Sequence, residues 1–349
     1  AGIDVVFGDG VKIIPDGTFR GCSKLISVKI PESVTSIGNY AFFGTSLTEV
    51  TLPSGIKEIA EGVFSCCEKL TKAVIPEGVT SIGKDAFAWC KALTEVNIPA
   101  GVKEIAEGVF CGCESLSEIT IPDSVTNIGP KAFYLCKSFT EITLPDNINN
   151  IGYSAFYGCE NLKSILLPSE LTSIGEYAFY NCESLTGITI PSGVKEIPAC
   201  AFANCKSLAE ITLPDNINNI GISAFSGTSL TEVTLPNSIK EIAGCVFFDC
   251  EKLIKVTIPE SVESICGSAF NGCTSLKAFA LPDSVMSISD SAFKDCTSLT
   301  EITIPDGVKC INNNTFSGCS GLKTVTLGKG VENIYDYAFE NCTSLTEIT

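Results

Sequence analysis

The chain has 349 residues, 45% of them hydrophobic and 18% charged, so it contains ample material for a core. Its formal net charge of −17 argues against nucleic acid or an anionic membrane surface as a partner, because both are bound through basic patches. Histidine is absent, which excludes catalytic groups built on an imidazole and removes the commonest metal ligand. The sequence also contains no apolar run of the length that spans a membrane.

A phenylalanine recurs along the whole chain at steps of 23 residues, apart from two steps of 22. Its positions are Phe19, Phe42, Phe64, Phe87, Phe110, Phe133, Phe156, Phe179, Phe202, Phe225, Phe247, Phe270, Phe293, Phe316 and Phe339. The short steps follow Phe42 and Phe225, where both units read Gly-Thr-Ser-Leu and lack one residue. A period of this size is typical of a solenoid, so we predict about 15 stacked units forming one domain over residues 1–349.

Each unit begins with a short strand. In the unit that leads to Phe110, Val96 and Ile98 alternate with polar residues, which is the period of a strand. Pro99 follows at once and cannot donate a ladder hydrogen bond, so it ends the strand. Stacking of the units then predicts a row of short parallel strands.

A helical turn is predicted in the second half of each unit. Val102, Ile105 and Val109 recur at spacings of three and four, as on one face of a helix. The segment is too short for a long helix, and many units carry a glycine directly after the isoleucine. We therefore expect an α/β repeat solenoid with strands on one face and short helical turns on the other. One unit does not bury enough apolar surface to fold alone.

The pattern Leu-x-x-Val-x-Ile-Pro-x-x-Val-x-x-Ile-Gly-x-x-Ala-Phe-x-x-Cys covers nearly the whole chain. It resembles the BspA-like, or Treponema-type, leucine-rich repeat. The resemblance implies a right-handed leucine-rich-repeat superhelix and a bacterial or protist cell-surface protein that adheres to host matrix proteins or other microbes. It implies no enzymatic activity of the repeat, and it supplies no residue-level binding site.

The chain opens and closes inside strand positions, with Val5 and Phe7 at one end and Thr349 at the other. Neither end has a polar unit that would cap a solenoid. The sequence therefore predicts a segment of a longer chain. The alternative is that another copy covers the exposed coil, which would give end-to-end stacking into a fibre.

Thirteen of the 19 cysteines occupy one position, three residues after the repeat phenylalanine. Cysteine behaves there as a small buried hydrophobe, so the pattern predicts a ladder of core thiols rather than a chain of disulfides. Of the remaining cysteines, Cys245 and Cys266 lie in adjacent units and are the pair considered for a disulfide. The spacings do not match a zinc site, and we expect no metal or cofactor.

Two surfaces are candidate binding sites. On the strands, Glu95, Glu118 and Glu141 would stack among threonines, either as a solvated sheet or as a site for a cation or a basic partner. Paired carboxylates also serve glycosidases, but nothing in the sequence marks one of these carboxylates as buried.

Tyrosines define the second surface. Tyr134, Tyr157 and Tyr180 each follow a repeat phenylalanine in three successive units, and Tyr153 and Tyr177 lie nearby. A strip of stacked tyrosines could bind sugar or protein, although half-buried packing explains the same pattern. Trp89, the sole tryptophan, is expected to pack at the edge of the turns.

The sequence favours a non-enzymatic extracellular or cell-surface protein. Its predicted role is adhesion, through binding of a protein or a glycan on host or neighbouring cells. The alternative is a structural protein that assembles by end-to-end stacking into a fibre or surface layer.

Overall fold

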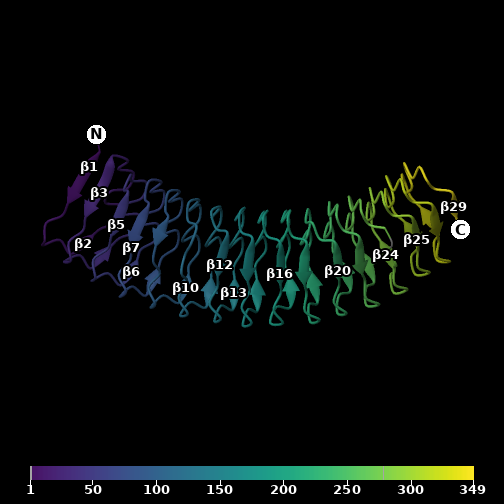
Figure 1. Cartoon of the computed structure of the whole chain (residues 1–349), viewed down its shortest axis with the longest axis horizontal. Coiled ribbons are helices and arrows are strands. Elements are labelled where there is room, and N and C mark those ends of the chain that lie inside the picture. The colour runs from purple at the N-terminus through teal and green to yellow at the C-terminus, as the bar shows by residue number, and fades with distance from the viewer. Residues whose placement is uncertain (1, 278) are drawn as a thin grey trace. The chain divides into compact units, whose positions relative to one another are not determined.

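The computed structural model describes residues 2–277 and 279–349. The chain divides between Glu183 and Ser184 into two compact units, called unit 1 and unit 2. Both units are built from the same coil, and strands of successive coils pair in parallel within each unit (Figure 1). The register is one repeat: Ile142 pairs with Ile165 in unit 1, and Val233 pairs with Val256 in unit 2. The repeat solenoid is thereby confirmed for each unit, and its continuity as one domain stays a prediction.

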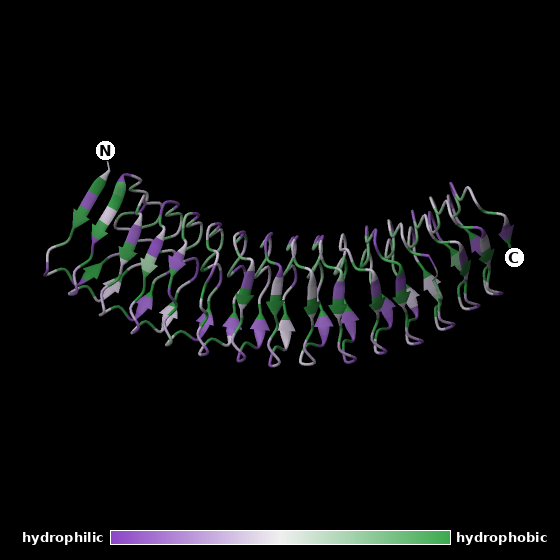
Figure 2. Ribbon diagram, in the orientation of Figure 1, coloured by the Kyte–Doolittle hydropathy of each residue, from purple (hydrophilic) through white to green (hydrophobic). Residues whose placement is uncertain are grey.

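The first row of strands occupies the position that the alternating pattern predicted. In unit 1 these strands are β1 (Ile3–Val6), β3 (Leu25–Lys29), β5 (Glu49–Thr51), β7 (Lys72–Val74), β9 (Glu95–Val96), β12 (Glu141–Thr143) and β14 (Ser164–Leu166). In unit 2 they are β16 (Gly187–Thr189), β18 (Glu210–Thr212), β20 (Glu232–Thr234), β22 (Lys255–Thr257), β25 (Glu301–Thr303), β27 (Thr324–Thr326) and β29 (Glu347–Ile348). Polar and apolar residues alternate along them, as the hydropathy colours of the ribbon show (Figure 2). In β5 and β12 the middle side chain is buried in the core and its two neighbours face solvent.

A second row of strands crosses each coil after the proline. In unit 1 it comprises β2 (Ile13–Ile14), β4 (Ser36–Ile37), β6 (Glu58–Ile59), β8 (Ser81–Ile82), β10 (Glu104–Ile105), β11 (Asn127–Ile128), β13 (Asn150–Ile151) and β15 (Ser173–Ile174). In unit 2 it comprises β17 (Glu196–Ile197), β19 (Asn219–Ile220), β21 (Glu241–Ile242), β23 (Ser264–Ile265), β24 (Ser287–Ile288), β26 (Cys310–Ile311) and β28 (Asn333–Ile334). In most coils the isoleucine of this two-residue strand is buried in the core.

The expected helical turns are not found, because the described residues contain no helix. In the segment whose spacing predicted a helical turn, Ile105 belongs to strand β10, and the residues around the phenylalanine form a run of turns. The residues two before and two after the phenylalanine are left-handed in all fifteen coils; in the coil of Phe87 these are Asp85 (φ 54°) and Trp89 (φ 60°). Two left-handed residues four positions apart do not continue a right-handed helix. No segment of the described residues could therefore cross a membrane as a helix.

The core of each unit is a stack of phenylalanine rings. Neighbouring rings of the repeat position lie 5.3 to 5.9 Å apart between centroids and within 19° of parallel, as Phe133 and Phe156 do in unit 1. Most of these rings are completely buried. Because the centroid separation exceeds the strand spacing of about 4.8 Å, the rings are offset, which is the arrangement that aromatic quadrupoles favour.

The thiol ladder runs beside the phenylalanines and is confirmed. The Cys136 thiol is buried and donates to the Phe110 carbonyl one coil earlier, with Sγ 3.1 Å from the oxygen. The same bond recurs along both units and satisfies a carbonyl inside the core. In the two shortened coils Thr45 and Thr228 replace the cysteine, and their hydroxyls contact the thiol of the next coil. The suspected partners Cys245 and Cys266 both carry free thiols.

Candidate functional site

The tyrosines of the repeat position form a ladder on the surface of unit 1. Each follows a buried phenylalanine, so the backbone that directs the phenylalanine inward leaves the next side chain at the surface. The Tyr134 and Tyr157 rings are 4.7 Å apart and inclined by 17°, and those of Tyr157 and Tyr180 are 4.8 Å apart and inclined by 11°. All three side chains are half-exposed. The sequence left half-buried packing and partner binding as alternatives for this strip; the rings are stacked and half-buried, and a binding role stays a prediction.

Two further tyrosines extend this surface. Tyr153 meets Tyr177 edge to face at 5.8 Å, and Tyr177 lies 5.8 Å from Tyr180. Tyr153 is 45% exposed, whereas the other four predicted tyrosines are half-buried. The structure therefore brings the five predicted tyrosines into one contiguous group.

A hollow of about 530 Å³ lies beside these tyrosines, which we call the aromatic hollow. It is lined by Lys84, Asp85, Trp89, Glu107, Cys111, Lys131, Tyr134, Tyr153, Ser154, Tyr157 and Tyr177. Tyr180 joins it through the ladder rather than by lining it.

Trp89 belongs to the aromatic hollow, and sequence reasoning treated it as isolated packing. Its left-handed backbone tilts the indole over the next coil, where a Cβ on Gly112 would collide with the ring. The same rule holds elsewhere: Leu135 covers Gly158, and in unit 2 Asp249 covers Gly272. The sequence shows the glycine one repeat after Trp89 but not the left-handed backbone of Trp89, so the position of the indole could not be read from the sequence.

The charges of the aromatic hollow are balanced. Lys84 and Glu107 form an ion pair with 3.0 Å between nitrogen and oxygen. Burial raises the pKa of the Asp85 carboxyl above its ordinary value, and the Lys84 ammonium opposes this shift. Lys131 is the second basic group and acts electrostatically on both Asp85 and Cys111. Two ammonium groups therefore face two carboxylates, although the chain as a whole is strongly acidic.

Two neutral groups of the hollow are held in their protonated forms. Burial, together with the nearby Asp85 carboxylate, raises the pKa of the Cys111 thiol to about 11. Burial and the neighbouring Tyr134 and Tyr180 raise the pKa of Tyr157. At neutral pH the hollow therefore presents a thiol and phenols, not a thiolate nucleophile.

The predicted acidic strand face forms a hollow of its own. Glu95, Glu118 and Glu141 line one hollow of about 350 Å³ with their neighbouring threonines. The Glu95 carboxylate is paired with Lys72, at 2.6 Å between oxygen and nitrogen. Among the described residues no cluster of three or more cysteine, aspartate or glutamate side chains is arranged to hold a metal ion. A binding role for these glutamates stays a prediction.

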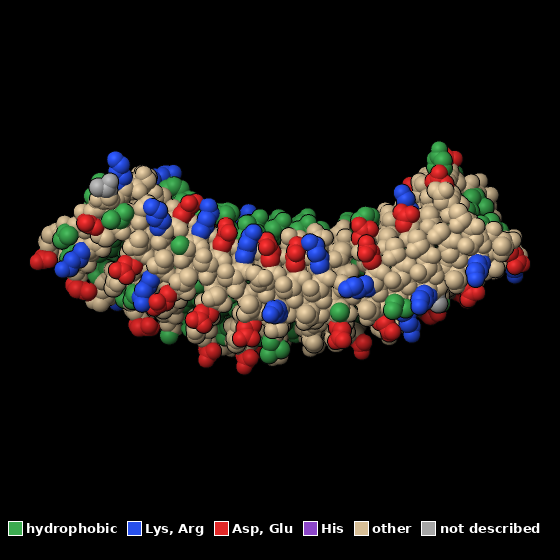
Figure 3. Space-filling model, turned by 45° about the horizontal axis from the view of Figure 1, so that its top comes forward, with side chains coloured by type: hydrophobic (Ala, Val, Ile, Leu, Met, Phe, Trp, Pro, Cys, Tyr) green, Lys and Arg blue, Asp and Glu red, His purple; other side chains and the backbone are tan. Residues whose placement is uncertain are grey.

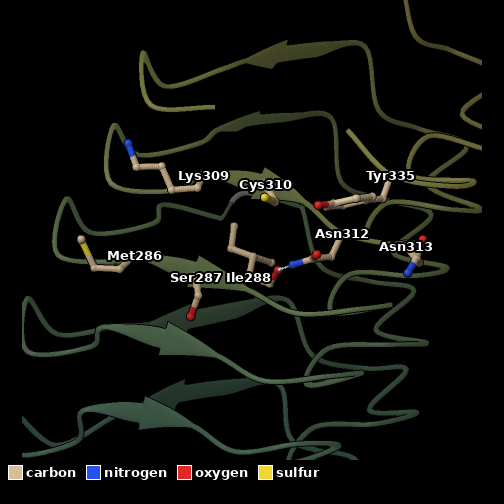
Figure 4. A pocket seen from close by; sticks show the side chains of 8 residues that line it. All are labelled: Met286, Ser287, Ile288, Lys309, Cys310, Asn312, Asn313 and Tyr335. Carbon is tan, nitrogen blue, oxygen red and sulfur yellow. Dashed lines mark hydrogen bonds between the residues drawn. The ribbon is translucent and has the colours of Figure 1, made fainter. Parts of the chain in front are cut away.

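Unit 2 has a smaller hollow of about 330 Å³, lined in part by Met286, Lys309, Cys310 and Tyr335 (Figure 4). The Tyr335 hydroxyl points toward the Cys310 side chain, and the electrostatic and hydrogen-bond interactions between the two groups raise the pKa of the tyrosine. Asn312 donates to the Ile288 carbonyl, 2.7 Å away, and so is engaged with the backbone. With a single aromatic ring among its lining residues, this hollow offers less contact area to a ligand.

The face seen in Figure 3 carries interspersed acidic and basic side chains. Several are paired one repeat apart, such as Lys137 with Glu160 and Lys240 with Glu263. Exposed pairs of this kind contribute little energy and solvate the coil surface. The aromatic hollow differs from these pairs in that it combines several aromatic rings with its charged groups.

A family model for the BspA type leucine-rich repeat region matches residues 12–140, 126–254 and 246–349. These matches cover almost the whole sequence, and the chain belongs to the BspA-type leucine-rich-repeat family. The resemblance seen in the repeat pattern is thereby confirmed. No curated protein matches the chain in sequence.

Solved structures of bacterial repeat proteins resemble the chain. A leucine-rich repeat protein from Bacteroides ovatus is 30% identical over 86% of this chain and 86% of its own, with a TM-score of 0.73. A leucine rich cell surface protein from Faecalibacterium prausnitzii is 28% identical over 99% of this chain and 86% of its own, with a TM-score of 0.51. The pneumococcal vaccine antigen PcpA, 21% identical over 84% and 85% of the two chains with a TM-score of 0.50, shares the fold.

Proposed function

We propose that this chain is a non-enzymatic adhesion module that acts at the cell surface and binds a protein or glycan through the aromatic hollow. The observation that carries the proposal is the convergence of Trp89 and four tyrosines on one concave site with balanced charges. Aromatic side chains supply large contact area at low conformational entropy, which suits them to binding surfaces. The neutral Cys111 thiol and the absence of histidine from the sequence argue for binding rather than catalysis.

The extracellular location rests on the family and on its relatives. The Faecalibacterium prausnitzii protein, which resembles this chain over nearly its full length, is a cell surface protein. A surface role for the present chain is the simplest extension of that likeness, and its partners would then lie on host or neighbouring cells.

Adhesion of beads coated with the protein to cultured epithelial cells and to bacterial cells tests this function. The double variant Trp89→Ala/Tyr157→Ala removes two rings of the hollow, and Asn271→Ala changes the position equivalent to Tyr157 in unit 2. We expect wild type and Asn271→Ala to adhere equally and the double variant to lose at least nine-tenths of the adhesion. Equal adhesion by the double variant, with its fold intact by circular dichroism, would contradict the proposal.

End-to-end assembly into a fibre stays the alternative prediction. Light scattering of the protein under reducing conditions measures it directly. Filaments would make self-assembly the leading function, whereas discrete particles would leave adhesion as the leading function.

A further inference from the structure

The aromatic hollow has a gap between two ring systems. Tyr134 stacks against Tyr157 on one side. On its other side the equivalent position of the preceding coil is Cys111, a much smaller residue. Trp89 bounds the same hollow from the coil before that and leans over Gly112. Trp89 and Tyr134 therefore stand on either side of the small residue Cys111.

The size of the hollow fits a small extended ligand better than a folded protein. Its volume of about 530 Å³ lies within the range of small-molecule sites. It extends from the coil of Phe87 to the coil of Phe179, four steps of about 4.8 Å, or roughly 19 Å. A stable protein interface buries about 800 Å² on each partner, which needs a wider surface than this hollow supplies.

The charges of the hollow select against charged ligands. An acidic ligand would meet the Asp85 and Glu107 carboxylates, and a basic peptide or quaternary ammonium would meet Lys84 and Lys131. Lys84 is already paired with Glu107. A neutral ligand with many hydroxyl groups can form hydrogen bonds with both kinds of charged group, since each hydroxyl donates to a carboxylate or accepts from an ammonium group.

We propose that the aromatic hollow binds an uncharged pyranose oligosaccharide. The apolar face of a sugar ring packs on Tyr134 and Trp89 above Cys111, and its hydroxyls bond to Asp85 and Lys131. Tyr153 and Tyr157 carry the following sugars along the tyrosine ladder. This inference rests on the proposed adhesive function and names the chemistry of its ligand.

Fluorescence tests the proposal directly, because Trp89 is the sole tryptophan of the chain. The wild-type protein is titrated with pentasaccharides of glucose, mannose, xylose and N-acetylglucosamine, and an array of uncharged glycans extends the search. We expect a saturable change in Trp89 emission with at least one uncharged oligosaccharide. Tetramethylammonium, sialyllactose and pentalysine serve as cationic, acidic and peptide probes, for which we expect no saturable change.

Variants locate the binding. Tyr134→Ala and Tyr157→Ala should each weaken the response at least tenfold, while the unit 2 control Asn271→Ala should leave it unchanged. Calorimetry with Trp89→Phe, which keeps a ring, should retain most of the affinity that Trp89→Ala loses. Failure of every uncharged glycan, or saturable binding of a charged probe alone, would overturn the inference.

A second measurement separates this inference from the adhesive function. Target cells are oxidised with periodate, which cleaves vicinal diols, and are digested with chitinase and β-1,3-glucanase, which hydrolyse chains that lack internal vicinal diols, before the bead assay. We expect at least one of these treatments to abolish adhesion. Adhesion that survives all of them but requires Trp89 and Tyr157 would overturn the glycan inference and leave the adhesive function standing. Adhesion that does not depend on Trp89 and Tyr157 would show that the aromatic hollow does not mediate adhesion.

Discussion

Unit 1 and unit 2 share one coil but display different surfaces. The buried ring separations are nearly the same, 5.4 Å for Phe156 and Phe179 and 5.3 Å for Phe270 and Phe293. The residue after the phenylalanine differs: unit 1 has Tyr134, Tyr157 and Tyr180, and unit 2 has Phe248, Asn271 and Lys294. The comparison teaches that the repeat supplies a constant frame, and that binding chemistry is set by side chains at positions the frame leaves free.

Alkaline pH is expected to have the largest effect, and it acts on the frame of both units. Burial raises the pKa of the Cys67 thiol to about 11 and the pKa values of Cys90, Cys113, Cys136 and Cys159 well above the ordinary range. The folded state keeps protons that the unfolded chain releases above about pH 8.5, so stability is complete below that pH and falls as the pH rises. Above that pH each thiol lowers the free energy of unfolding by about 1.4 kcal/mol per pH unit, so these five together lower it by roughly 7 kcal/mol per pH unit.

Urea unfolding at pH 7, 8, 9 and 10, followed by Trp89 emission, measures this loss in unit 1. The double variant Cys90→Thr/Cys136→Thr copies the natural threonines of the short coils and should lower the pH slope by about 2.8 kcal/mol per unit. An unfolding midpoint that stays constant from pH 8 to pH 10 would show that the ladder thiols are not as buried as described.

Loss of a core ring is expected to be the next largest effect and should be equal in the two units. Phe156→Ala and Phe270→Ala each remove a fully buried ring, which typically lowers the free energy of unfolding by about 3–5 kcal/mol. Hydrogen exchange read by mass spectrometry assigns the loss to each unit, and Asn271→Ala serves as the surface control. A difference of more than about 2 kcal/mol between the two variants would contradict the idea of a constant frame.

A methyl group at a covered glycine should distinguish the units. Gly112→Ala places a Cβ against the Trp89 indole and at φ 71°, so we expect a loss of about 1–2 kcal/mol and a change in Trp89 emission. Gly272→Ala in unit 2 meets Asp249 instead and should destabilise without changing the emission. Gly21→Ala has open space around its Cβ and isolates the backbone effect. Unchanged emission in Gly112→Ala would argue against the position of the indole.

The surface ion pairs are expected to have the smallest effect. Lys72→Met removes the partner of Glu95, and both side chains are largely exposed, so the loss should be about 0.2–1 kcal/mol and should vanish at high salt. The unit 2 pair of Lys240 and Glu263 is longer, at 3.9 Å, and Lys240→Met should have less effect still. The midpoints of urea unfolding at low and high salt measure the loss of stability in both variants. A salt-independent loss would indicate packing by the lysine stem instead.

Periodicity alone determined much of the architecture. The recurring phenylalanine, the alternation at Val96 and Ile98 and the constant phase of Cys136 translate directly into stacked rings, parallel strands and a thiol ladder. The reason is that in a solenoid equal positions of successive coils are neighbours in space, so a one-dimensional pattern already contains the contacts.

Tertiary structure alone decided the path of the coil and the composition of the site. The spacing of Val102 and Ile105 fits a helical turn, but pairing with the next coil made it a strand, and left-handed residues on both sides of the phenylalanine completed the turn. Trp89 joins Tyr134 across two coils only because its backbone tilts the indole over Gly112. Local spacing does not encode that direction, since it depends on the φ of one residue and on the absence of a side chain one repeat later.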